Sequence, residues 1–121
     1  GDAYVDVMGF DTYCFQDPVK YQLELDRRLA LLQQISTEHG KVAALTETGF
    51  EKLPTANWWT QTLLPTLSKY NLSYVLVWRN GRPDHYYAPY PGQLSAEDFK
   101  QFYNSPRVLF QDRLSPLNIY K

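Results

Sequence analysis

The chain has 121 residues, enough to bury the core of one ordinary domain. Lys and Arg number 12 against 13 Asp and Glu, and the formal net charge is -1, so the sequence lacks the basic field that binds nucleic acid or anionic lipid. No run of about 18 apolar residues is present, and we therefore predict no membrane span. Aromatic residues make up 16% of the chain, which suggests that some rings face a ligand.

Metal and cysteine chemistry find little support in the sequence. Cys14 is the only cysteine, so an internal disulfide and a multi-cysteine zinc site are excluded. We interpret Cys14 as an incidental buried thiol. The two histidines, His39 and His85, are far apart and lack clustered acids, so we predict no metal site and no cofactor.

The first two predicted elements are a strand and a long helix. Residues 3–10 are mostly apolar and are predicted to form a strand. Asp17 and Pro18 are a favourable N-cap and first helical residue. Apolar residues then recur at helical spacing until Gly40, a typical C-terminal cap, which predicts a helix over residues 18–38.

Two further strands and two helices are predicted downstream. Residues 42–46 and 73–78 are short apolar runs typical of buried strands. A helix is expected near residues 55–70, with a kink at Pro65. A last helix is expected over residues 96–104.

Two details of these helices can be tested by the structure. Ser95 and Asp98 resemble a capping box at the start of the last helix. Trp58 and Trp59 are adjacent, so at most one is expected to face the sheet; the other would lie on a ligand-binding rim or be a plain surface residue.

The alternation of strand and helix is typical of parallel βα units, so the predicted fold class is α/β. A parallel sheet of three strands has two open edges and usually needs further strands beside it. We therefore expect the chain to be a fragment of a larger fold, with possible self-association through the open edges of the sheet.

Polar and aromatic residues follow each predicted strand. They are Asp11 and Tyr13, then Glu47, then Trp78 with Asn80. Because βα loops converge at the carboxyl ends of parallel strands, these side chains should meet at one edge of the sheet. Carboxylates, a phenol and an indole together are typical of sugar chemistry, in which the indole stacks on a pyranose and the acids bind hydroxyls or react.

Ordinary structural roles remain open for each of these residues. Glu47 could cap or salt-bridge a loop, Asp11 could cap a turn, Tyr13 could fill a half-buried site and Trp78 could belong to the core. His85, in the aromatic loop after the third strand, is a candidate for substrate contact or a plain loop residue.

Longer strings in the chain carry a family resemblance. "YVDVMGFDTY", "ALTETGFE" and "VLVWRN", followed by "HYYAPYPG" and "SPRVLFQDRL", resemble the C-terminal part of glycoside hydrolase family 26, the β-mannanases. The resemblance covers residues 1–121. It implies the C-terminal three βα units of a (β/α)8 TIM barrel, an incomplete barrel in which the three strands are the sixth, seventh and eighth.

The resemblance also implies roles for individual residues. Glu47 would be the nucleophile of a retaining hydrolase and Tyr13 would orient it. Asp11 and Trp78 would bind substrate. Asn80 and His85 are also predicted to bind substrate, from their position after the third strand rather than from the resemblance. The implied reaction is hydrolysis of internal β-1,4-mannosidic bonds through a glycosyl-enzyme ester.

One part of the family's site has no counterpart in the sequence. The family's acid/base Glu follows the fourth strand, and Glu51 is too close to Glu47 to replace it. The chain alone is therefore expected to be inactive. The alternative is a non-catalytic carbohydrate-binding or scaffold domain.

The resemblance further implies β-mannan or a manno-oligosaccharide as the partner, and a secreted, periplasmic or cell-surface location. Plain mannan, galactomannan and glucomannan all remain open as substrates, and so does cleavage from the chain ends in place of internal bonds.

Overall fold

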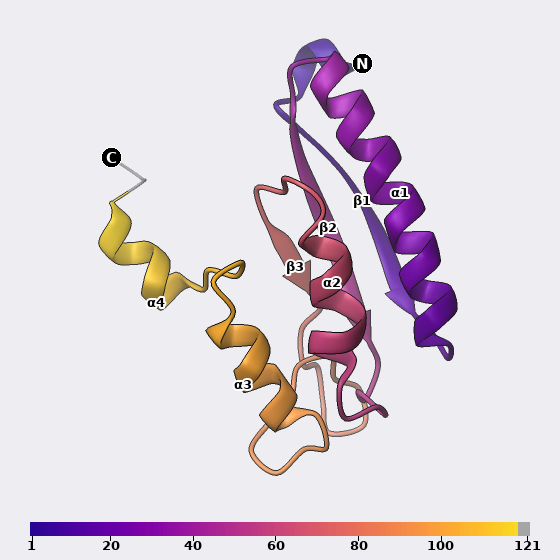
Figure 1. Cartoon of the computed structure of the whole chain (residues 1–121), viewed down its shortest axis with the longest axis vertical. Helices are drawn as coiled ribbons and strands as arrows, with labels where there is room; N and C mark the ends of the chain where they lie inside the picture. The colour runs from indigo at the N-terminus through magenta and orange to yellow at the C-terminus, as the bar shows by residue number, and fades with distance from the viewer. Residues whose placement is uncertain (119–121) are drawn as a thin grey trace.

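A three-stranded parallel sheet forms the centre of the structure, a computed structural model that describes residues 1–118. The strands are β1 (Val7–Cys14), β2 (Val42–Phe50) and β3 (Val75–Val77). They lie in the order β1-β2-β3, and both neighbouring pairs are parallel. Figure 1 shows α1 and α2 in front of this sheet, with α3 and α4 extending to one side. The predicted α/β class and the parallel sheet are confirmed.

The predicted ends of the strands were wrong. The strand expected at residues 3–10 lies further along the chain and ends at Cys14, and the strand expected at 42–46 continues to Phe50. The third strand is shorter than the predicted 73–78. Parallel pairing between β1 and β2 continues as far as the pair formed by Cys14 and Phe50, so backbone hydrogen bonding extends the strands through their polar residues. The polar residues expected after the first two strands therefore lie within them.

Helix α1 (Pro18–Glu38) has the predicted bounds. Oδ1 of Asp17 accepts hydrogen bonds from the backbone N–H groups of Val19 at 2.9 Å and Lys20 at 3.1 Å, which satisfies two free donors of the first turn. Gly40 follows the helix with φ +62°, the left-handed conformation that a C-terminal cap needs. The helix packs on the sheet through the buried side chains of Tyr21, Leu25, Leu29 and Leu32.

The second helical region is shorter and less regular than predicted. Instead of one helix over residues 55–70, the structure has a π-helix η2 (Trp59–Leu63) followed by α2 (Leu64–Leu67). Pro65 lies in the first turn of α2. Because proline has no N–H and crowds the preceding turn, the wider turn of η2 accommodates it where a regular α-helix would not.

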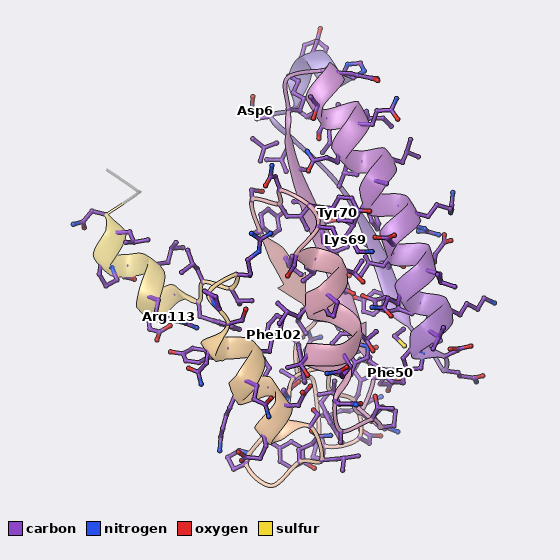
Figure 2. The ribbon with its side chains drawn as sticks, in the orientation of Figure 1. Asp6, Phe50, Lys69, Tyr70, Phe102 and Arg113 are labelled. Atoms are coloured by element: carbon purple, nitrogen blue, oxygen red, sulfur yellow. The ribbon has the colours of Figure 1, made fainter. Side chains whose placement is uncertain are left out.

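Both tryptophans of this region are fully buried, so the prediction of an exposed Trp was wrong. Trp58 packs against the rings of Tyr21 and Phe50, with centroid distances of 6.0 and 6.2 Å. Trp59 packs edge-on against Trp58, with a centroid distance of 4.9 Å, and also against α3, where the centroid of Phe102 lies 5.5 Å away. Figure 2 labels Phe50 on the side of α1 and Phe102 on α3. Two separate elements cover the two indoles, which the sequence of one helix does not reveal.

Asp98 caps a helix other than its own. It lies in α3 (Ala96–Asn104), but its carboxylate accepts hydrogen bonds from the backbone N–H groups of Trp59 at 2.9 Å and Thr60 at 3.1 Å, and from the Thr60 hydroxyl. Ser95 makes no side-chain cap to α3; its hydroxyl accepts from the Trp59 indole at 3.1 Å. The predicted capping box was therefore wrong, since both side chains hold η2 against α3.

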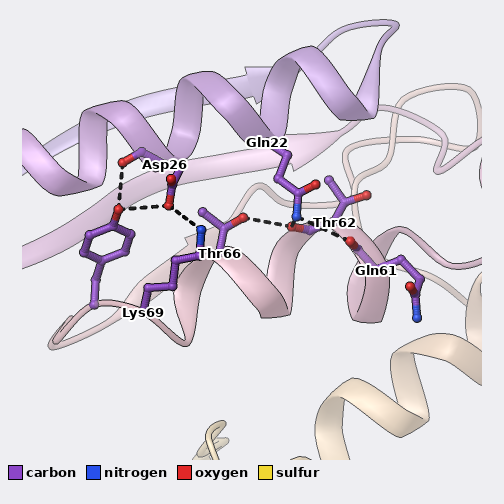
Figure 3. Close-up of polar contacts among 7 residues, drawn as sticks. Gln22, Asp26, Gln61, Thr62, Thr66 and Lys69 are labelled. Atoms are coloured by element: carbon purple, nitrogen blue, oxygen red, sulfur yellow. Dashed lines mark hydrogen bonds and ion pairs between the residues drawn. The ribbon is translucent and has the colours of Figure 1, made fainter.

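Polar contacts join α1 to the second helical region (Figure 3). Oδ1 of Asp26 accepts from Nζ of Lys69 at 3.0 Å and from the Tyr70 hydroxyl at 2.9 Å. One turn nearer the start of α1, the Gln22 amide donates to the backbone carbonyl of Thr62 at 3.2 Å. These bonds fix the two helices side by side on the sheet.

The remaining elements are short: η1 (Asp2–Tyr4), α4 (Gln111–Leu114) and η3 (Ser115–Leu117). Within residues 1–118 the outer edges of β1 and β3 have no further strand beside them, and the sheet is not closed. A groove of about 1220 Å³ runs beside β3 and is lined by apolar residues such as Val75 and Phe99. In the part of the chain that the structure describes, no helix is long and apolar enough to cross a membrane.

Candidate active site

A bulge in β2 sets the direction of the Glu47 side chain. Phe10 of β1 pairs with Leu45, but the next residue, Asp11, pairs with Glu47, so Thr46 is an extra residue on β2. The pairing of β2 with β3 advances by the same one extra residue. A bulge of this kind shifts the alternation of side chains by one position and often re-aims a side chain beside an active site.

Contacts on the two sides of the sheet show the result of this bulge. Thr48 faces α1, where its hydroxyl lies 2.5 Å from the Tyr21 hydroxyl. Thr46, two residues earlier, lies on the opposite face of the sheet from α1, where its hydroxyl donates to Asp11. Glu47 also faces away from α1 and bonds Tyr13. Two consecutive side chains thus lie on the sheet face opposite α1, which we call the inner face.

Tyr13 and Glu47, predicted to lie together, are in direct contact. The Tyr13 hydroxyl donates to Oε2 of Glu47 at 2.7 Å, in a half-buried position between the middle of β2 and the end of β1. Burial raises the pKa of the Tyr13 phenol well above its ordinary value, and the hydrogen bond to Glu47 and the charge of Glu47 raise it further. The phenol therefore stays neutral and remains a hydrogen-bond donor to the carboxylate.

Asp11 lies beside Glu47 on the inner face. The two residues are partners in the strand pairing, and Oδ1 of Asp11 accepts from the Thr46 hydroxyl at 2.7 Å. Gly9 leaves the space that Thr46 occupies, since a Cβ on Gly9 would lie 2.5 Å from the Thr46 methyl group. Asp11 is exposed, so its carboxylate remains accessible from the inner face.

Trp78 follows β3 directly and lies beside the same part of β2. Its backbone N–H donates to the carbonyl of Thr48 at 2.9 Å, so the ladder reaches the residue after Glu47. The indole is half-buried, and the guanidinium of Arg79 lies 5.9 Å from its ring centroid. Trp78 is therefore held next to Glu47 in the sheet, as expected from the strand order.

Asn80 makes contacts within the loop after β3, whereas His85 of the same loop contacts Glu51, the residue after β2. Oδ1 of Asn80 accepts from the backbone N–H groups of Tyr87 at 3.0 Å and Ala88 at 2.9 Å, and its amide donates to the Ala88 carbonyl at 3.0 Å. Nδ1 of His85 lies 3.0 Å from Oε1 of Glu51. These contacts brace the loop; the predicted contacts of Asn80 and His85 with substrate stay predictions.

Tyr87 is part of this group and was missed from the sequence. Its ring lies edge-on to Tyr13, with a centroid distance of 5.5 Å and an interplanar angle of 62°. The signal that could have found it is Gly49, because an isolated glycine within a strand often marks a close approach of another group. A Cβ on Gly49 would lie 2.5 Å from a ring carbon of Tyr87.

Cys14 takes no part in the group on the inner face. It is buried in the core, and burial, followed by the charge of Asp17, raises its pKa to about 12. A thiol with so high a pKa is a poor nucleophile. Across residues 1–118, no three or more His, Cys, Asp and Glu side chains gather in a way that could hold a metal ion.

Comparison with solved structures gives strong matches. A GH26 β-mannanase from Bacteroides ovatus is 47% identical, with a TM-score of 0.89, over 100% of this chain. GH26C from a Muricauda species is 30% identical with a TM-score of 0.83, over 93% of this chain. The chain corresponds to the C-terminal part of a glycoside hydrolase family 26 barrel.

A third match is a modular endo-β-1,4-mannanase from Cellulomonas fimi, at 31% identity and a TM-score of 0.79 over 93% of this chain. The chain spans only about a third of these family 26 proteins: 36%, 32% and 27% of their respective lengths. No protein-family model and no curated protein matches it. The predicted family and the incomplete TIM barrel are confirmed.

Proposed function

We propose that this chain forms part of a retaining endo-β-1,4-mannanase, in which Glu47 is the nucleophile. The observation that carries the proposal is the hydrogen bond of 2.7 Å between the Tyr13 hydroxyl and Oε2 of Glu47 on the inner face. A sugar-binding surface alone has no need of a carboxylate fixed in this way. The family 26 neighbours include β-mannanases, which support mannan as the substrate class.

In the proposed first step, Oε1 of Glu47 attacks the anomeric carbon of the bound sugar. Tyr13 holds Oε2, so the carboxylate is fixed in one orientation before substrate arrives. Negative charge leaves the carboxylate as the ester bond forms, while the leaving oxygen takes a proton from a separate acid. Water then attacks the same anomeric carbon and gives its proton to the separate acid, which now acts as a base. The bond to Glu47 breaks, the carboxylate is regenerated, and the sugar leaves with its configuration retained.

The acid that protonates the leaving oxygen is proposed to be a residue other than those in this chain. A retaining pair needs two carboxyl groups about 5 to 5.5 Å apart on opposite sides of the bond. Glu51 is exposed in the loop after β2 and pairs with His85, and Asp11 lies next to Glu47 rather than across from it. We therefore propose that the chain alone is inactive.

Trp78 and Asp11 are the proposed sugar contacts on either side of Glu47. An indole next to the nucleophile can stack on the apolar face of the reacting mannose. Asp11 carries an accessible carboxylate oxygen that can accept from a sugar hydroxyl. Asn80 and His85 are proposed to contact substrate only at the rim, because their polar atoms already brace the loop.

A covalent trap tests this proposal directly in the full-length protein that contains the chain. A 2-deoxy-2-fluoromannosyl fluoride forms the glycosyl ester but slows its hydrolysis, because fluorine at C2 destabilises the charged transition state of both steps and fluoride is a good leaving group. Peptide mass spectrometry should find the label on Glu47. A label on another carboxylate would overturn the assignment. Retention on immobilised mannan without any label or hydrolysis would instead favour a non-catalytic carbohydrate-binding domain.

We also propose a secreted, periplasmic or cell-surface location, which a polymeric substrate such as mannan supports.

A last proposal concerns the behaviour of the chain in solution. The open edges of β1 and β3 and the groove beside β3 support self-association of isolated residues 1–121. Sedimentation should then show oligomers, whereas a stable, monodisperse monomer would contradict this.

A further inference from the structure

Tyr87 is linked to the proposed nucleophile, Glu47, through one intervening side chain, that of Tyr13. Its ring packs edge-on against Tyr13, and Tyr13 in turn donates to Glu47. The chain of contact therefore runs from the loop after β3 to the end of β1 and then to the middle of β2. None of the catalytic steps above requires Tyr87 to touch substrate.

Gly49 provides the place where the ring of Tyr87 sits. Gly49 lies two residues after Glu47 on the inner face and pairs with Tyr13 across the strands. A Cβ there would lie 2.5 Å from Cδ1 and 3.1 Å from Cγ of Tyr87. Real Cβ atoms essentially never make a contact this short, so a residue with a side chain at position 49 would displace the Tyr87 ring. The ring therefore rests directly on the backbone of β2.

The loop holds Tyr87 from two sides. Asn80 accepts from the backbone N–H of Tyr87 at 3.0 Å and bonds both polar backbone groups of Ala88. The His85 ring meets the Tyr87 ring edge-on at 5.4 Å and 89°, and Nδ1 of His85 lies 3.0 Å from Oε1 of Glu51. Glu51 directly follows β2, so the pair ties the loop back to the strand that carries Glu47.

We propose that Tyr87 is a positioning residue, whose ring confines Tyr13 to the rotamer that places its hydroxyl on Oε2 of Glu47. This inference rests on the proposed function of Glu47. The Tyr87 ring occupies the space beside Tyr13, so Tyr13 cannot swing towards β3. The role belongs to the ring and not to the Tyr87 hydroxyl, because the rings make the contacts with Tyr13 and His85, and ring carbons are the atoms nearest to Gly49.

The test uses Tyr87→Leu and Tyr87→Phe in the full-length protein, with mannan hydrolysis as the assay. Tyr87→Leu should lower kcat roughly 10- to 100-fold, the order expected when a catalytic group is misplaced by about 1 Å. KM should change much less, since the proposed role of Tyr87 is exerted on Tyr13 and not on the sugar. Tyr87→Phe keeps the ring and should have nearly the kcat of the unmodified protein. Tyr90→Leu, at an exposed tyrosine of the same loop, is the matched control and should leave kcat unchanged.

A double-mutant cycle separates positioning from a general loss of structure. If Tyr87 acts only through Tyr13, then Tyr87→Leu should cost little further activity in a protein that already carries Tyr13→Phe. Independent, multiplying losses would overturn the inference, as would equal damage from Tyr87→Phe and Tyr87→Leu. If Tyr87→Leu does not fold, Gly49→Ala displaces the ring instead and should lower kcat in the same way; unchanged kcat in that variant would also overturn it.

The outcome for Glu47 distinguishes this inference from the function on which it rests. If Glu47→Ala keeps full activity, the proposed function fails and the role of Tyr87 fails with it. If Glu47→Ala is inactive but Tyr87→Leu has the kcat of the unmodified protein, the function stands and only the positioning role is rejected.

Discussion

Replacing Tyr13 by Phe removes one hydrogen bond from the proposed nucleophile and little else. The ring, and with it the packing against Tyr87, is kept. The bond of 2.7 Å joins a neutral donor to a carboxylate in a half-buried site. Without this bond the carboxylate is free to turn away from the anomeric carbon. A hydrogen bond to a charged group, worth about 1.5 to 3 kcal/mol, sets the free-energy cost of that misorientation. At about 1.36 kcal/mol for each tenfold change in rate, we expect kcat/KM to fall about 10- to 150-fold.

Initial rates of reducing-sugar release from β-mannan by the full-length protein measure this effect. Because the pKa of Tyr13 is raised, its phenol stays protonated at neutral and mildly alkaline pH. Tyr13→Phe should therefore lower activity by the same factor throughout this pH range. Tyr103→Phe, which removes a phenol from an exposed contact with Asp112 in the C-terminal region, is the matched control. If the two variants have equal activity, Tyr13 does not orient Glu47 and the reasoning fails.

Three further changes probe the site and the fold in the full-length protein. Trp78→Ala should weaken binding of the reacting sugar by about 1 to 3 kcal/mol, as for loss of a stacked aromatic anchor; unchanged mannan kinetics would remove Trp78 from the site. Asp98→Ala should destabilise the protein by about 2 to 3 kcal/mol, because the N–H groups at the start of η2 lose a charged acceptor, and an unaltered melting temperature would contradict this. Hydrogen bonds from Lys69 and then Tyr70 lower the pKa of Asp26, so its contribution to stability is complete above about pH 4 and is lost as the pH falls through the lowered value. Thermal melts of Asp26→Asn and of the unmodified protein should therefore differ at pH 7, by less than about 1 kcal/mol at this exposed site, and should converge once the pH lies below the lowered pKa.

The sequence predicted the fold well where local signals and the global structure agree. Asp17, Pro18 and Gly40 marked both ends of α1 correctly because capping is a local interaction. The ends of β1 and β2 were missed because strand pairing, which is not local, carries the ladder through polar residues. Asp98 was misread for a similar reason, since its partners lie on a helix nearly forty residues away in sequence.

The site was predicted in its residue types but not in its geometry. The acid and the phenol at Glu47 and Tyr13 were expected to lie together, and they do. What the sequence does not reveal is the bulge at Thr46, which turns Glu47 to the inner face, because a bulge becomes visible only when the pairing with a neighbouring strand is known. Tyr87 was hidden in an aromatic loop, and only the glycine at position 49 hinted that a ring would rest against the strand.

Hydrolysis of β-mannan by the full-length protein with and without Glu47→Ala is the most direct test of the central claim. Glu97→Ala, which removes an exposed carboxylate on α3, is the control for loss of charge. If Glu47 is the nucleophile, its replacement should lower kcat at least about 1,000-fold while the melting temperature changes little and Glu97→Ala remains active. Equal activity of Glu47→Ala and the unmodified protein, or no hydrolysis by either, would contradict the claim and leave carbohydrate binding as the function of this surface.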